Sequence, residues 1–264
     1  MTVTYLDKIL DFHRDRAAAD ERSEAWLHEA IASQAASTPG SVGRRGFAAR
    51  LADPGLAVIS EIKRRSPSKG DLLANLDPVH LATEYQAGGA RALSVLTDED
   101  HFGGSTMDLV QARAAVSIPV LRKDFTVDRR DILDARLMGA DCVLLIVAAL
   151  NDDELSEFRQ LAADVGLDAL VETHDEAEVE RALAAGATLI GVNQRDLLTF
   201  EVDTDRAVRV RAAIPAEAVA VAESGIKGPE DAAILAAAGY HAILVGESLV
   251  ISGDPRKAVQ SLLV

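Results

Sequence analysis

Cysteine is almost absent from this sequence. Cys142 is the only one, so the chain cannot form an internal disulfide, and it lies within the apolar run DCVLLIVAAL. A lone cysteine in such a run is typical of a small core residue, and a chain without disulfides suits a reducing compartment. We therefore expect a cytoplasmic protein.

Long hydrophobic runs and an excess of positive charge are also missing. No apolar run is long enough to span a bilayer, and the N-terminal stretch MTVTYLDKILDFHRDR carries charges every few residues, unlike a secretory signal. Acidic side chains number 42 and basic ones 27, and the net charge of -15 argues against a general nucleic-acid or anionic-membrane surface. We expect no nucleic-acid or membrane partner and a monomeric chain.

Metal-ligand spacing is absent as well. The six histidines show no paired arrangement of the kind that binds zinc: His13, His28, His80, His101, His174 and His241. We expect neither a metal nor a cofactor. His174 follows Glu172 by two residues and could face the same site, but a loop position is the favoured interpretation.

What the sequence does contain is a series of eight β-like runs. Each is nearly continuously apolar, which is typical of parallel strands covered on both faces. The runs are LAVISEIK (56–63), ALSVLT (92–97), PVLRKDF (119–125), DCVLLIVAAL (141–150), DALVETH (168–174), TLIGVN (188–193), AVAVAESGI (218–226) and HAILVGESL (241–249).

Helical segments alternate with these runs. Residues 152–166, for example, carry one apolar stripe made of Leu155, Phe158, Leu161 and Ala162. Glycine stands where a helix should end in AGGA (87–90), MGAD (138–141), AAGA (184–187) and AAGY (237–240). Eight βα units in 264 residues predict an α/β protein with a closed (β/α)8 TIM barrel. An open doubly wound sheet is the alternative, but no GxGxxG or GxxxxGK[ST] phosphate loop supports it.

An N-terminal helical extension precedes the first strand. We expect it to occupy residues 1–55 of a single domain that spans 1–264. Its first helix carries the apolar face Leu6, Ile9, Leu10 and His13, and the helical pattern continues around Trp26, which we expect to pack against the barrel. The extension should cover part of the barrel.

Polar side chains gather where the strands end. Glu61 and Lys63 alternate at the end of the first run, so both should face the same side. The ends of later runs carry further polar groups: Lys123, Glu172, Asn193 with Arg195, and Glu223 with Ser224. A single charge at a strand end can mean only that the chain leaves the buried core through polar residues. Five of eight strands with such groups predict an active site at the carboxyl-terminal mouth of the barrel.

Glycines follow the last two strands. Gly225 lies in ESGI and Gly246 in VGES, and barrels often bind phosphate at this position, because glycine lets backbone N–H groups approach an anion. Either glycine alone would indicate only a turn. Together they predict a phosphorylated small-molecule ligand.

The loop RRSPSKG lies on the opposite rim. Ser66 could add a hydroxyl group to the phosphate site, and Arg65 or Lys69 could add positive potential. For at least two of Arg64, Arg65 and Lys69, however, a solvated loop position is the favoured interpretation.

These motifs resemble the indole-3-glycerol phosphate synthase family. The matching segments are EIKRRSPSKG, LRKDF, LVETH, GVNQRDL, AESGI and LVGESL, and they cover nearly the whole chain in the family's order. The resemblance implies a carbon–carbon lyase of tryptophan biosynthesis. Its reaction closes the pyrrole ring of 1-(2-carboxyphenylamino)-1-deoxyribulose 5-phosphate, with loss of CO2 and water.

The resemblance also implies roles for residues. Lys123 stands at the family's general-acid position, and we expect nearby carboxylates to keep it charged although burial opposes this. Glu172 matches the base, and Lys63 matches a second acid that also holds the substrate carboxylate. Glu61 should orient the lysines, and Asn193 should bind a substrate hydroxyl.

The remaining family positions form the polar ring and the binding walls. Arg195, Glu223 and Ser224 complete the ring, while the expected contacts to phosphate and substrate come from Ser66, Gly225, Gly246, Glu247, Phe125 and Leu244. Two other functions stay open from the residues alone. One is a sugar-phosphate isomerase or a Schiff-base aldolase that uses Lys63 or Lys123, and the other is a catalytically silent phosphate-binding protein.

Overall fold

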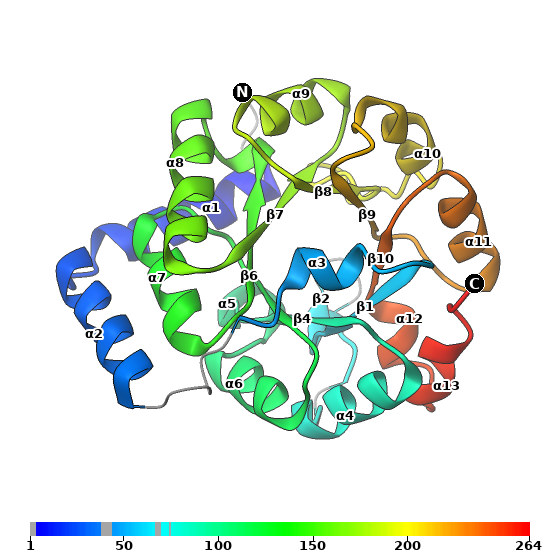
Figure 1. The fold of residues 1–264 in the computed structure, drawn as a ribbon, viewed down its shortest axis with the longest axis horizontal. Helices are drawn as coiled ribbons and strands as arrows, with labels where there is room; N and C mark the ends of the chain where they lie inside the picture. The colour runs from blue at the N-terminus through cyan, green and yellow to red at the C-terminus, as the bar shows by residue number, and fades with distance from the viewer. Residues whose placement is uncertain (1–3, 38–43, 67–69, 74) are drawn as a thin grey trace.

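The computed structural model describes residues 4–37, 44–66, 70–73 and 75–264. Eight parallel strands form a closed barrel in the order β1-β10-β9-β8-β7-β6-β5-β4, as Figure 1 shows. The predicted (β/α)8 fold is therefore confirmed. The strands are β1 (Ala57–Ile62), β4 (Ala92–Leu96), β5 (Val120–Lys123), β6 (Cys142–Ile146), β7 (Asp168–Thr173), β8 (Leu189–Asn193), β9 (Val219–Glu223) and β10 (Ala242–Val245).

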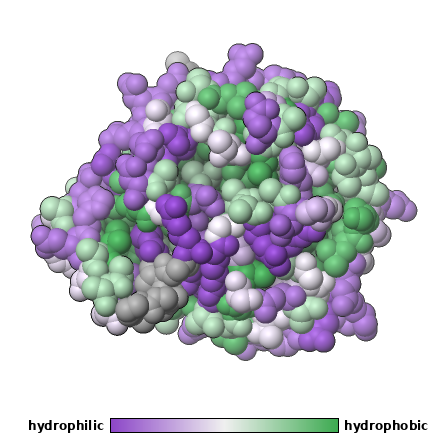
Figure 2. Space-filling view, in the orientation of Figure 1, coloured by the Kyte–Doolittle hydropathy of each residue, from purple (hydrophilic) through white to green (hydrophobic). Residues whose placement is uncertain are grey.

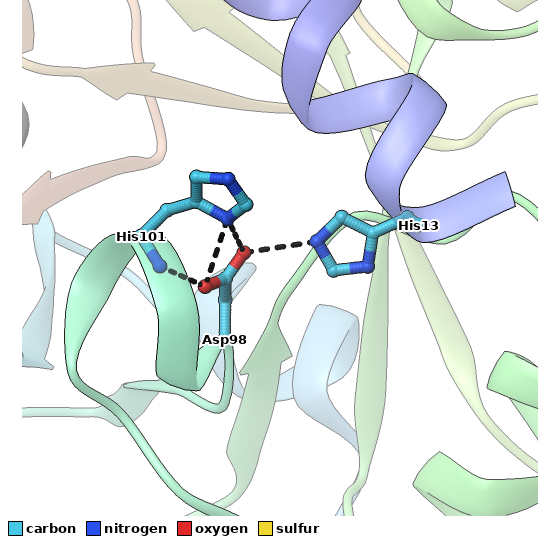
Figure 3. Close-up of side chains that lie close together, drawn as sticks. All are labelled: His13, Asp98 and His101. Atoms are coloured by element: carbon cyan, nitrogen blue, oxygen red, sulfur yellow. Dashed lines mark hydrogen bonds and ion pairs between the residues drawn. The ribbon is translucent and has the colours of Figure 1, made fainter. Parts of the chain in front are cut away.

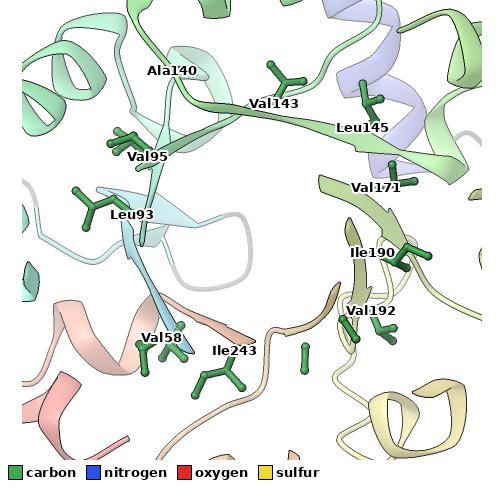
Figure 4. Packing of buried hydrophobic residues seen from close by; sticks show 14 of the residues in the cluster. Val58, Leu93, Val95, Ala140, Val143, Leu145, Val171, Ile190, Val192 and Ile243 are labelled. Atoms are coloured by element: carbon green, nitrogen blue, oxygen red, sulfur yellow. The ribbon is translucent and has the colours of Figure 1, made fainter. Parts of the chain in front are cut away.

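Alternation along the strands divides the core into two layers. Inside the barrel lie small and branched side chains that include Ile59, Leu121 and Cys142. The intervening residues point outward, where the helices cover them, and Figure 4 shows Val58, Leu93, Val95, Val143, Leu145, Val171, Ile190, Val192 and Ile243 in this outer layer. Because the strand period is two, each strand supplies both layers.

The outer ring consists of helices that follow the strands. They are α4 (Pro78–Gly88), α6 (Thr106–Ala115), α7 (Arg129–Met138), α8 (Asp152–Val165), α9 (Glu176–Ala184), α10 (Arg206–Val210), α11 (Pro229–Ala237) and α13 (Pro255–Gln260). Shorter elements lie between them: β2 (Arg65–Ser66), β3 (Gly70–Asp71), α5 (Glu99–Phe102), η1 (Val147–Ala149), η2 (Arg211–Ala213) and α12 (Glu247–Val250).

Helix α8 illustrates how the local sequence sets these elements. Asn151 and Glu154 form a reciprocal capping box at its start, and the predicted apolar stripe is buried. Burial of that stripe against the strands stabilises the helix more than its intrinsic propensity does.

The described residues of the N-terminal extension form three helices, α1 (Tyr5–Ala18), α2 (Glu24–Ser37) and α3 (Phe47–Leu51). The helical pattern is interrupted at residues 19–23, so α2 is a separate helix. The expected packing of Trp26 is wrong: its side chain is 55% exposed, whereas the adjacent Leu27 is fully buried. One residue corresponds to about 100° of helix rotation, which turns Leu27 toward the protein and Trp26 toward solvent.

Helix α3 covers the amino-terminal end of the barrel. Phe47 and Leu51 are fully buried against the first residues of the strands. In Figure 1, α3 crosses the barrel opening that faces the viewer, and α1 lies behind the strands at the other end. Figure 2 shows the same face, where hydrophilic residues gather around the centre. Among the described residues, no helix is both long and apolar enough to cross a membrane.

Candidate active site

A cavity of about 620 Å³ opens at the carboxyl-terminal ends of the strands. Its lining includes every residue that the sequence singled out for the site: Glu61, Lys63, Ser66, Lys123, Phe125, Glu172, Asn193, Arg195, Glu223, Ser224, Gly225, Leu244, Gly246 and Glu247. The barrel thus brings residues from distant segments to one mouth. Their individual roles stay predictions.

Glu61 and Lys63 form one charged pair at the end of β1. The Nζ atom of Lys63 lies 2.5 Å from Oε1 of Glu61, and both side chains are mostly buried. Gly246 leaves room for this pair, because a Cβ atom at that position would lie 2.4 Å from Oε1 of Glu61. Gly246 is therefore needed for packing against Glu61, in addition to any role with phosphate.

Lys123 forms the second charged group, at the end of β5. Its Nζ atom lies 3.2 Å from Oε2 of Glu172 and 3.0 Å from Oε2 of Glu223. Burial alone would lower the pKa of Lys123, but the charges of Glu223, Glu172 and Glu61 raise the pKa above its usual value. The prediction that carboxylates keep this lysine charged is confirmed.

The two glutamates that contact Lys123 differ in acidity. Burial raises the pKa of Glu223 to about 7, with Glu172 adding to the rise and Lys123 opposing it. Burial would also raise the pKa of Glu172, but Lys123, His174 and a hydrogen bond from Asn193 hold it below the usual value. At neutral pH, Glu172 is therefore ionised while Glu223 holds a proton part of the time. Carboxyl groups with separated pKa values are the usual basis for distinct acid and base roles.

Asn193 and Arg195 follow β8. The side-chain oxygen of Asn193 accepts a hydrogen bond from the backbone N–H of Arg195 at 3.0 Å, which leaves its amide nitrogen directed toward Glu172. The guanidinium group of Arg195 donates to the carbonyl oxygen of Phe200 at 3.1 Å. This contact holds the loop after β8 over the cavity.

The ends of β9 and β10 provide the candidate phosphate site. Ser224 and Gly225 both have positive φ angles, 66° and 74°, and a non-glycine residue in that region is strained. Gly246 precedes α12, so backbone N–H groups of that turn border the cavity. The expected position of Ser66 on the opposite rim is wrong, because β1 pairs directly with β10 and the loop after β1 therefore lies beside this site. The buried Oγ atom of Ser66 has no hydrogen-bond partner among the described residues. A ligand oxygen could satisfy it.

The expectation of a solvated loop is wrong for Arg64 and Arg65. Arg64 binds Asp108 through two hydrogen bonds, 2.7 and 3.0 Å long, because the planar guanidinium matches a carboxylate. Arg65 donates to the carbonyl oxygens of Asp100 and His101. Arg64 therefore fastens the loop after β1 to α6, and Arg65 fastens it to α5. Lys69 lies outside the described residues.

One wall of the cavity was not predicted. Helix α1 contributes Tyr5, Leu6 and Ile9, and Phe102 and Phe200 add further apolar surface. The signal for α1 was its amphipathic pattern, which identified a buried face but not the surface that buries it.

A buried cluster fastens α1 to the end of β4. Figure 3 shows Asp98 between two imidazole rings, with its Oδ2 atom 2.9 Å from Nε2 of His13 and 3.0 Å from Nδ1 of His101. Three such groups could hold a metal ion. However, Arg16 lies 3.0 Å from Nδ1 of His13 and can only donate, so Nε2 of His13 carries the proton and donates to Asp98. Hydrogen bonds thus account for the arrangement of these three side chains without a metal ion. The spacing of the residues in the sequence did not reveal this cluster.

His174 lies in the short loop between β7 and α9, so the predicted loop position is confirmed. Its ring is partly buried, with Nδ1 3.0 Å from Oε2 of Glu178 and Nε2 3.9 Å from Oε1 of Glu172. The ring therefore faces Glu172 from outside the cavity lining.

These features define a (β/α)8 barrel with paired acidic and basic groups in a cavity at the carboxyl-terminal mouth, an arrangement typical of enzymes of this fold. Solved structures with this fold include 3-hexulose-6-phosphate synthase, with a TM-score of 0.64 and 14% identity over 78% of this chain and 98% of that one. A thiamine phosphate pyrophosphorylase from Pyrococcus furiosus has a TM-score of 0.59 and 17% identity over 80% and 95%. At this level of identity, the likeness shows the fold alone.

The sequence comparisons identify the family. Residues 6–262 match the model of indole-3-glycerol phosphate synthase. The indole-3-glycerol phosphate synthase of Rhodococcus jostii (strain RHA1) is 50% identical over 261 residues, which are 99% of this chain and 95% of the relative. That of Paenarthrobacter aurescens (strain TC1) is 55% identical over 204 residues, 77% of this chain and 75% of the relative. The chain belongs to the indole-3-glycerol phosphate synthase family. It is a carbon–carbon lyase of tryptophan biosynthesis and acts on a phosphorylated small molecule.

Proposed function

We propose that Lys123 is the general acid of ring closure. The observation that carries this proposal is the position of its ammonium group between Glu172 and Glu223 in the cavity wall. Ring carbon attacks a ketone, and the developing alkoxide needs a proton donor at that moment. A lysine whose pKa is raised by carboxylates remains charged until the alkoxide forms.

Glu172 acts as the base of the final dehydration in this proposal. Its lowered pKa keeps it ionised, and its contact with Lys123 lets the proton that it removes return to the acid. Lys63 is the second acid, holds the substrate carboxylate and protonates the leaving hydroxyl, while Glu61 orients it. Asn193, Arg195 and the pair Glu223–Ser224 complete the polar ring.

The substrate phosphate binds among the loops that follow the neighbouring strands β1, β10 and β9. Ser66 offers a buried hydroxyl without a partner among the described residues, and the turns around Gly225, Gly246 and Glu247 offer backbone N–H groups. Phe125 and Leu244 line the same cavity and supply apolar walls for the aromatic ring. We further infer that the chain acts as a cytoplasmic monomer and as one domain, which its single buried cysteine and its continuous barrel support.

The decisive experiment adds 1-(2-carboxyphenylamino)-1-deoxyribulose 5-phosphate to the purified protein and follows indole fluorescence. The proposal expects fluorescence to rise in the wild type and in Lys8→Met, an exposed control on α1, but not in Lys123→Met. Borohydride added during turnover should trap no adduct, because a charged lysine is a poor nucleophile. A covalent adduct at Lys123 or Lys63 would contradict acid catalysis.

A further inference from the structure

The two glutamates that contact Lys123 have unequal surroundings. Each places one oxygen near the ammonium group, at 3.2 Å for Glu172 and 3.0 Å for Glu223. The other oxygen of Glu172 faces His174. The other oxygen of Glu223 is buried and has no hydrogen-bond partner within the part of the chain that the structure describes. An ionised oxygen without a partner in a buried site is costly, so the geometry favours a proton on Glu223.

Glu178 holds the His174 ring in this position. Its Oε2 atom accepts from the backbone N–H of His174 at 2.7 Å and lies 3.0 Å from Nδ1 of the ring. A carboxylate can only accept, so Nδ1 carries a proton. The Nε2 atom then points toward Glu172 and has no hydrogen-bond partner among the described residues. At 3.9 Å this contact is too long for a direct hydrogen bond, and the ring acts on Glu172 through its charge.

Charged groups from several elements surround His174. Burial would lower its pKa, but Glu178 of α9 and Glu172 of β7 raise it above the usual value, with Arg206 of α10 opposing them. Arg206 in turn lies 3.8 Å from Asp196, whose charge offsets part of its effect. The imidazole therefore keeps its positive charge to higher pH than an ordinary histidine, next to the carboxylate of Glu172 that must stay ionised to act as a base.

We propose that His174 is a positioning residue. It keeps the proton shared by the two buried glutamates on Glu223, so that Glu172 stays ionised and can act as the base. This inference rests on the proposed role of Glu172 as the base. Lys123 contacts both carboxylates, so its charge does not favour ionisation of one over the other. Of the two, His174 faces only Glu172 and so favours ionisation of that group. The amide of Asn193 adds to the same preference.

The test is the pH dependence of kcat/KM in His174→Gln. Glutamine keeps polar contacts but carries no charge, so Glu172 should take up a proton at higher pH than in the wild type. We expect the acid limb of the profile to move to higher pH, and at pH values below that limb activity should fall about tenfold for each unit of the shift. Once the pH is high enough for the wild-type imidazole to be neutral as well, the two profiles should converge.

Two further variants sharpen the test. Glu178→Gln keeps an acceptor for Nδ1 but removes the charge that favours a protonated ring, so its acid limb should shift in the same direction by less. His80→Gln changes an exposed histidine on α4 and should reproduce the wild-type profile. A structural role for His174 would lower activity equally at all pH values, and that result in His174→Gln would overturn the inference.

The outcome also separates this inference from the role of Glu172. If Glu172→Gln is inactive at every pH and His174→Gln keeps the wild-type limb, only the inference about His174 fails. If Glu172→Gln retains near-normal turnover, the proposed base itself is wrong. Should His174→Gln not fold, an unshifted limb in Glu178→Gln overturns the inference.

Discussion

The two ends of the barrel bury charge in different ways. At the amino-terminal end, Asp141 accepts four hydrogen bonds, two from the side chain of Arg113 and two from the backbone N–H groups of Arg45 and Val120. At the carboxyl-terminal end, Lys123 joins two carboxylates, and Oε1 of Glu223 has no partner among the described residues.

This difference fits the proposed division of roles, in which charges at the amino-terminal end stabilise the fold and charges around the cavity take part in the reaction. When one partner is removed from a buried ion pair whose donors and acceptors are all hydrogen-bonded, the free energy of unfolding falls by several kcal/mol. Groups with unsatisfied atoms and displaced pKa values are typical of sites that bind and react. At the cavity end of this barrel the hydrogen bonding of buried charges is therefore incomplete, as is typical of a reactive site. At the end covered by α3 it is complete for Asp141.

The largest expected effect is on turnover. Lys123→Met should lower kcat by about 10²–10⁴-fold, the usual contribution of a positioned general acid, because the alkoxide then lacks its proton donor. Substrate should still bind. The measurement is indole fluorescence at saturating substrate, with Lys8→Met as the control for an exposed lysine on α1. Near-normal turnover would show that Lys123 is not the general acid of ring closure.

A matched change at the other end should affect stability instead. Asp141→Ala leaves the guanidinium of Arg113 buried without its carboxylate, so we expect a loss of about 3–5 kcal/mol in the free energy of unfolding. Chemical denaturation provides the measurement. Asp153→Ala, an exposed aspartate on α8, should change stability by no more than about 0.5 kcal/mol. Equal losses in both variants would contradict the comparison.

Lys63→Ala should affect both binding and turnover. In the proposed mechanism its charge holds the substrate carboxylate before the reaction and its ammonium group serves as an acid afterwards. We therefore expect kcat/KM to fall by about 10–100-fold, the range for charged hydrogen bonds of roughly 1.5–3 kcal/mol. Substrate titration separates the two contributions. Unchanged substrate affinity would show that Lys63 does not contact the carboxylate.

Asp98 is the charge that sharpens the comparison, because it lies at the cavity end but is fully hydrogen-bonded. Burial would raise its pKa, yet hydrogen bonds from His13 and His101 lower it to about 2. A lowered pKa stabilises the folded state above the unfolded value near 4, and this contribution disappears as the pH falls through about 2. Asp98→Asn should therefore lower the free energy of unfolding by about 2 kcal/mol at neutral pH, which chemical denaturation measures. The difference from the wild type should shrink as the pH falls below about 4, and a constant difference would exclude the ionised pair as its cause.

The fold followed from local patterns, because apolar runs of strand length and glycine-terminated helices repeat along the chain. The polar site residues at the strand ends were predictable for the same reason, since a barrel brings every strand end to one mouth. Phe125, Leu244 and Glu247 were expected in the site only from the family resemblance. The contacts of Arg64 with Asp108, of His13 with Asp98 and of His174 with Glu178 were not predicted. The first two join segments distant in sequence, and the third depends on the turn into α9. Trp26 was misplaced because one residue of helix rotation decides between solvent and core.

The most direct test of the account measures kcat per folded molecule for Lys123→Met and Asp141→Ala in one assay. The folded fraction of each comes from the same denaturation series. We predict that kcat per folded molecule collapses in Lys123→Met and stays close to the wild type in Asp141→Ala. Equal loss in both variants, or full activity in Lys123→Met, would contradict the division of the barrel into a stabilising end and a reactive end.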